Sequence, residues 1–67
     1  MTPRRLGQMV KRLREANGLT QVQLAKRVGV SQSYIAQLES GRKASPSLPI
    51  LRKLAKVLDV PVAALVE

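Results

Sequence analysis

The sequence predicts an all-α fold of five short helices. Apolar residues recur at three- and four-residue spacing, Ser or Thr precedes most of these runs, and Gly or Pro stands near their ends. No run of alternating apolar and polar residues indicates a strand, and no repeat or interdomain linker interrupts the chain. We therefore expect residues 1–67 to form one compact domain. Its core must be aliphatic, because Phe and Trp are absent and Tyr34 is the only aromatic residue.

The first two helices have clear start and stop signals. Thr2 is the expected N-cap before Pro3, where a missing N–H costs nothing, and Gly18 ends this helix. Thr20, with Gln23 three residues later, forms a capping-box pattern that begins the second helix. The expected inner faces of these helices consist of Leu6, Val10, Leu13, Leu24, Ala25 and Val28.

The third helix follows a glycine turn. Gly29 supplies the turn, Ser31 caps the helix and Gly41 stops it. Ile35 and Leu38 form its inner edge, so we expect this edge to pack on the first two helices.

Two further helices are expected in the last third of the chain. Ser47 caps a fourth helix that accommodates Pro49 in its first turn. Its apolar stripe consists of Leu51, Leu54, Ala55 and Leu58. Residues 59–61 break this helix, and a short fifth helix is expected over 61–66.

Positive charge dominates the composition. The chain contains twelve Lys and Arg residues and four Asp and Glu residues, which gives a net charge of +8 and a pI near 11.3. Such a balance in a small domain is typical of a nucleic-acid binder, although a well-solvated surface also explains it. Membrane-surface binding is less favoured, because the cations are spread over short elements with no Trp or Phe to anchor an interfacial helix.

Several other classes are disfavoured by what the sequence lacks. The chain has no Cys and no His, its carboxylates show no paired spacing, and no glycine loop resembles a phosphate cradle. We therefore expect no enzyme activity, cofactor, metal or small-molecule ligand. No apolar run approaches the ~20 residues of a membrane span and no signal-peptide pattern opens the chain. We expect a cytoplasmic, nucleoid-associated protein.

The outer face of the third helix is polar but uncharged. Because Ile35 and Leu38 fix the buried side, small and amide side chains occupy the opposite side. The residues on or beside that side are Gln32, Ser33, Tyr34, Ala36, Gln37 and Ser40. In the major groove, Gln can pair bidentately with adenine, and Ser can donate to or accept from several bases. A plain solvated face explains the same residues equally well.

Groups suited to phosphate flank this face. Gln21 stands at the start of the second helix, where free backbone N–H groups favour anions. Arg42 and Lys43 follow the third helix beside Ser40. Backbone-binding and base-contacting groups therefore stand where a single docking pose on DNA requires both.

The spacing of these motifs matches a known family over most of the chain, roughly residues 6–65. The matching residues are Leu19-Thr20-Gln21, Leu24-Ala25, Gly29-Val30-Ser31, Ile35, Leu38-Glu39, Gly41, Pro46-Ser47, Leu51 and Leu54-Ala55. The pattern resembles the Cro/C1-type (XRE-like) helix-turn-helix domain of phage repressors and related bacterial regulators. The resemblance implies a compact five-helix, lambda-repressor-like domain, with a helix-turn-helix at about 20–40 and the third helix in the major groove.

The resemblance also implies roles for individual residues. Base contacts are implied for Gln32, Ser33 and Gln37. Phosphate contacts are implied for Gln21, Tyr34, Ser40, Arg42 and Lys43. The expected partner is double-stranded DNA, bound by a repressor-type transcriptional regulator, either as a monomer or as a homodimer on adjacent half-sites.

Two other binding functions compete with this interpretation. A protein-interaction module with the same fold, such as an antitoxin or a bridging factor, is the main alternative. Such a role would favour exposed Leu, Met or aromatic anchors. RNA is less favoured, because Tyr34 is the only aromatic side chain available for stacking on bases.

An ion pair is expected inside the scaffold. Glu39 borders the inner side of the third helix, and Arg14 borders the apolar stripe of the first helix in the same way. Because a lone buried carboxylate is costly, we predict that the two side chains pair. Related repressors similarly join helices one and three through an Arg–Glu bridge. Two solvated charges are the alternative.

Three features depart from the family pattern. Val22 stands where a charged or polar residue is usual, and we expect it to be exposed. Pro61 replaces the usual hydroxyl cap of the fifth helix. No further domain is expected after Glu67, and the Val and Leu residues of 62–66 are expected either to close the core or to form a small dimer patch.

Overall fold

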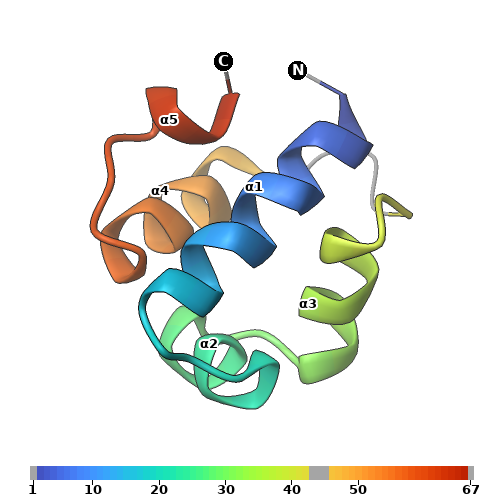
Figure 1. Cartoon of the computed structure of the whole chain (residues 1–67), viewed down its shortest axis with the longest axis vertical. Helices are drawn as coiled ribbons and strands as arrows, with labels where there is room; N and C mark the ends of the chain where they lie inside the picture. Colours follow the sequence, from blue (N-terminus) through green and yellow to red (C-terminus); the bar gives the residue numbers. More distant parts are fainter. Residues whose placement is uncertain (1, 43–45, 67) are drawn as a thin grey trace.

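The structure is a computed structural model that describes residues 2–42 and 46–66, and within them the chain forms five helices and no strand (Figure 1). The helices are α1 (Pro3–Ala16), α2 (Gln21–Val28), α3 (Gln32–Glu39), α4 (Leu48–Val57) and α5 (Ala63–Val66). The predicted all-α fold is confirmed. In this part of the chain, no helix combines the length and apolar character that a membrane crossing requires.

The first four helices begin at the hydroxyl caps that the sequence predicts. Each hydroxyl accepts a hydrogen bond from the backbone N–H three residues ahead, and the capping residues are Thr2, Thr20, Ser31 and Ser47. At the start of α2 the capping box is complete, because Gln23 Oε1 also accepts from the Thr20 N–H at 2.9 Å. A cap of this kind stabilises a helix by about 1 kcal/mol.

The apolar faces of the helices meet in one aliphatic core. Its buried members are Leu6, Val10, Leu19, Leu24, Ala25, Val28, Ile35, Leu38, Leu51, Leu54, Ala55, Leu58 and Leu65. Leu13, expected among them, is only partly buried and packs against the edge of the core. In Figure 1, α1 crosses the middle of the molecule, with α3 and α4 on opposite sides of it. The core therefore holds α3 at the edge of the molecule.

The backbones of α1 and α3 touch at Gly7. A Cβ at this position would lie 2.3 Å from the carbonyl oxygen of Leu38 and 2.8 Å from that of Glu39. Real Cβ atoms do not approach backbone atoms so closely, so only glycine allows this crossing. Just beyond α3, a Cβ on Gly41 would lie 3.1 Å from Arg4 Cα. The start of α1 thus covers the end of α3.

The last helix is shorter than predicted, beginning at Ala63 instead of Pro61. The chain enters α5 through a tight turn. The Ala64 and Leu65 N–H groups donate to carbonyls only three residues back, at 3.0 and 2.9 Å. Leu65 is buried, while Val62 and Val66 are partly buried and pack against the core. These side chains close the core at one end of α1.

Candidate nucleic-acid interface

A tight turn joins α2 to α3. Gly29 adopts a left-handed conformation with φ 88°, and its N–H donates to Ala25 O at 2.8 Å. The N–H of Val30 donates to the same oxygen at 3.0 Å, and Ser31 then caps α3. This hydrogen-bonded glycine turn is the connection of a helix-turn-helix, and it sets the angle between the two helices.

The outer side of α3 presents uncharged polar side chains to solvent. Ile35 and Leu38 are completely buried, so their positions fix which side of the helix faces outward. Gln32, Ser33 and Gln37 are all exposed. We call these three residues the reading face. Their amides and hydroxyl provide donors and acceptors without the indiscriminate attraction of a charge.

The end of α3 directs the chain back beside this helix. Gly41 adopts φ 83°, and the Arg42 N–H donates to Gln37 O at 3.0 Å, as in a Schellman motif. The Arg42 side chain, which is expected beside the reading face, is exposed. Lys43, also expected there, lies outside the described residues.

Ser40, which was expected to donate to a phosphate, already uses its hydrogen-bond donors within the protein. Its hydroxyl donates to Gln37 O at 2.9 Å, and its N–H donates to Ala36 O at 3.0 Å. Both donors of Ser40 are therefore used within the helix end. Its hydroxyl must rotate away from Gln37 before it can donate to a phosphate.

A buried ion pair joins α1 to α3. Arg14 Nε donates to Glu39 Oε2 at 2.7 Å and Nη2 donates to Oε1 at 3.1 Å, while Nη1 donates to Leu19 O at 2.8 Å. The two side chains are 11% and 4% exposed. The hydrogen bond to Glu39 raises the pKa of Arg14, although burial opposes this effect. The guanidinium of Arg14 stays charged at all ordinary pH values, since arginine is protonated throughout.

A chain of amide hydrogen bonds continues from this pair to the reading face. Glu39 Oε1 also accepts from Gln21 Nε2 at 3.2 Å, and Gln21 Oε1 accepts from Gln32 Nε2 at 3.4 Å. Gln21 is thus a bridge between the scaffold and the first residue of α3. Sequence reasoning assigned Gln21 only to phosphate, because a contact between the starts of two helices depends on the angle of the turn between them.

Tyr34 lies at the border of the reading face. Its ring is half-buried and packs against the aliphatic core, and burial raises the pKa of its hydroxyl. The apolar part of this side chain thus helps to hold the first turn of α3 in place.

In the described part of the chain, no three His, Cys, Asp or Glu side chains gather where they would hold a metal ion. Val22 on α2 is 45% exposed, which agrees with the expectation for this apolar residue.

The glycine turn, the capped helices α2 and α3 and the exposed polar side of α3 define a helix-turn-helix protein. The helix-turn-helix family model matches residues 10–65. The chain therefore belongs to the helix-turn-helix family, as the resemblance predicts.

The chain is similar in sequence to bacterial and phage regulators. It is 36% identical to the HTH-type transcriptional regulator SinR of Bacillus subtilis over 62 residues, covering 92% of this chain and 56% of SinR. It is 43% identical to the immunity repressor protein of Bacillus phage phi105 over 61 residues, covering 91% and 42%. The chain spans about half the length of these curated relatives.

Solved structures share the fold. The restriction-modification controller protein C.AhdI from Aeromonas hydrophila has a TM-score of 0.87 at 36% identity, over 94% of each chain. A crystal structure of SinR in complex with DNA has a TM-score of 0.88 at 35% identity, over 92% of this chain and 98% of that one. These likenesses extend over nearly the whole chain.

Proposed function

We propose that this chain binds duplex DNA sequence-specifically, with α3 in the major groove, as part of a repressor-type transcriptional regulator. The observation that carries the proposal is the uncharged reading face, exposed on a helix that is held rigidly by a glycine crossing and a buried ion pair. The names of the relatives, a transcriptional regulator and an immunity repressor, and the DNA complex of SinR support the same function.

The proposed base contacts come from Gln32, Ser33 and Gln37. Gln37 lies in the last turn of α3 and Gln32 in the first, so together they span the length of helix that a major groove admits. The bond from Gln32 to Gln21 limits the rotamers of Gln32 before DNA arrives. A preordered donor loses less side-chain entropy on binding, which favours discrimination between bases.

The proposed phosphate contacts surround this face and fix the register of the helix on the duplex. They come from Gln21, Tyr34, Ser40, Arg42 and Lys43. Gln21 has one amide hydrogen left after its bond to Glu39, and its backbone N–H lies in the first turn of α2. Both groups suit an anion at a helix N-terminus.

The proposal assigns no enzyme activity and no cofactor to this chain, and it places the protein in the cytoplasm with the nucleoid. A protein-interaction module, such as an antitoxin or bridging factor, is the alternative for the same surface. The lack of a large apolar side chain on the reading face supports DNA over such a partner, because protein hot spots favour aromatic anchors.

Selection of bound duplexes from a random library tests the proposal. We expect one preferred motif to emerge, because the reading face offers specific hydrogen bonds. A palindrome with half-sites about one helical turn (~10 bp) apart would show a dimer, and a single short site would show a monomer. Recovery of unselected sequence after repeated rounds would contradict specific binding.

A further inference from the structure

A concave basic surface lies between the end of α2 and the C-terminal half of α4. It is an open hollow of about 560 Å³, lined by Arg27, Val28, Gly29, Lys53, Lys56 and Val57. We call it the basic hollow. Its volume lies within the roughly 300–1,000 Å³ typical of ligand-binding pockets. Nothing in the proposed DNA contact uses these residues.

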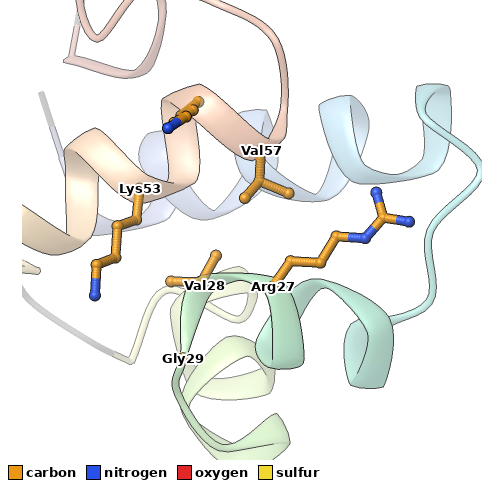
Figure 2. A pocket seen from close by; sticks show the side chains of 6 residues that line it. Arg27, Val28, Gly29, Lys53 and Val57 are labelled. Carbon is orange, nitrogen blue, oxygen red and sulfur yellow. The ribbon is translucent and has the colours of Figure 1, made fainter.

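The basic hollow has an apolar floor and charged sides. Figure 2 shows Val28 and Val57 facing each other between α2 and α4, while Lys53 and Arg27 extend in different directions from this floor. Val28 is buried, and both cations are exposed. In the described part of the chain, none of the three cations of the hollow has a carboxylate partner. The surface therefore combines unpaired positive charge with apolar area.

This arrangement decides which ligand fits. A single small anion such as phosphate would draw the cations together, whereas here Lys53 and Arg27 point apart. A ligand that satisfies both must carry separated negative charges with an apolar group between them. An acidic peptide segment with carboxylates two residues before and two residues after an aliphatic side chain has this pattern, because residues two apart share one face of an extended backbone.

We propose that the basic hollow is a docking site for an acidic peptide segment of a partner protein, with an apolar side chain of that segment against Val57, which is only partly buried. In Figure 1, α3 and α4 lie on opposite sides of α1, and none of the three residues of the reading face lines the hollow. The partner is therefore able to bind whether or not α3 occupies a DNA groove.

A matched pair of double variants tests this site on the whole chain. Arg27→Gln/Lys53→Gln removes two cations of the hollow, and Lys26→Gln/Arg52→Gln removes their exposed neighbours, which do not line it. Both variants lose the same net charge from the same two helices. The probe is the peptide Gly-Glu-Asp-Leu-Asp-Glu-amide with fluorescein on its N-terminal amine, a second peptide carries Gly in place of Leu, and binding is measured by anisotropy.

We expect the hollow variant to weaken binding of the Leu peptide roughly tenfold, while the neighbour variant loses about twofold or less. The Gly peptide should bind several-fold more weakly than the Leu peptide. In ¹⁵N-resolved NMR spectra, the Leu peptide should shift the amide signals of Val28, Gly29 and Val57. Equal losses in the two double variants, or equal affinities for the two peptides, would overturn the proposal.

A random-sequence DNA duplex separates this site from a second nucleic-acid contact. If the duplex shifts the signals of α3 and leaves those of the basic hollow unchanged, the peptide site is distinct. If the duplex displaces the peptide and shifts the signals of Lys53 and Val57, the hollow is a DNA contact and the proposal is wrong. Circular dichroism melting of both double variants verifies that each remains folded.

Discussion

The carboxylate of Glu39 connects the core of the molecule to its proposed DNA surface. It binds Arg14 with two hydrogen bonds and accepts a third from Gln21, which in turn accepts from Gln32. Both members of the ion pair are almost completely buried. The energy of such a pair depends on keeping both charges, because a single charge left in the interior has lost its water without gaining a partner.

Glu39→Gln is expected to destabilise the protein by about 3–5 kcal/mol, because it leaves the guanidinium of Arg14 buried without a counter-charge. Arg14→Met should also destabilise it, since Glu39 then keeps only the amide of Gln21. Urea denaturation measures both losses. Glu15→Gln is the control, because it removes an exposed carboxylate from α1 with the same change of charge. It should change stability by less than about 0.5 kcal/mol. A near-neutral Glu39→Gln would contradict a role for the pair in stability.

Tyr34 makes the folding stability of the protein depend on pH in the alkaline range. Burial raises the pKa of its hydroxyl above the ordinary value of about 10, so the folded state favours the neutral phenol. This contribution is fully present below about pH 10 and is lost as the pH rises through the raised folded value. Absorbance of the phenolate gives the titration directly, because Tyr34 is the only tyrosine.

Tyr34→Phe separates this effect from the titration of lysines in the same pH range. The variant should lose less stability than the parent when denaturation is compared below and above about pH 10. An absorbance midpoint at or below the ordinary tyrosine value would show that burial does not act on this hydroxyl.

At the scale of residues, the sequence predicts which side of a helix a residue lies on better than it predicts which side chains form hydrogen bonds with one another. The pairing of Arg14 with Glu39 was expected, because each borders the apolar side of its helix, and the structure contains this pair. The bonds of Gln21 to Glu39 and Gln32 were not expected. They depend on how the turn at Gly29 places one helix start beside another.

At the scale of elements, hydroxyl caps and glycine stops predict where helices lie, because both act within a few residues of chain. The start of α5 was placed two residues too early, at Pro61. Proline suits a first helical turn, but here the N–H groups of Ala64 and Leu65 bond to carbonyls three residues back, at Pro61 and Val62, and the α-helix begins only at Ala63. The crossing at Gly7 could not be predicted, because it depends on two helices distant in sequence.

Gly7→Ala tests the crossing of α1 and α3. In a free helix this change stabilises by roughly 1 kcal/mol, but here the new methyl group would lie 2.3 Å from Leu38 O. The helices must separate, so we expect a net loss of about 1–3 kcal/mol and a lower melting temperature. Gln8→Ala, at the next and exposed position, should be within about 0.5 kcal/mol of the parent. A Gly7→Ala variant as stable as the parent would show that the crossing is looser than described.

At the scale of the whole molecule, positive charge and uncharged polarity are separated. The reading face carries no charge, while Arg42 lies beside it and three further cations surround the basic hollow. Net charge alone predicts attraction to nucleic acid, but it does not say which side of the molecule is used. The assignment of residues 1–67 to one domain and the individual DNA contacts stay predictions.

In the proposed function, α3 selects DNA sequence through uncharged side chains, while charges beside it bind any sequence. The most direct test compares Gln37→Ala with Arg42→Gln on the selected duplex and on a random duplex, by anisotropy over a range of salt concentrations. Gln8→Ala serves as a control, because it removes an exposed amide from α1.

Gln37→Ala should weaken binding to the selected duplex by roughly 1–3 kcal/mol and leave the random duplex unaffected, because only base contacts are lost. Arg42→Gln should weaken both duplexes alike and reduce the slope of affinity against salt by about one. Equal losses on both duplexes for Gln37→Ala would contradict the claim that α3 carries the choice of sequence.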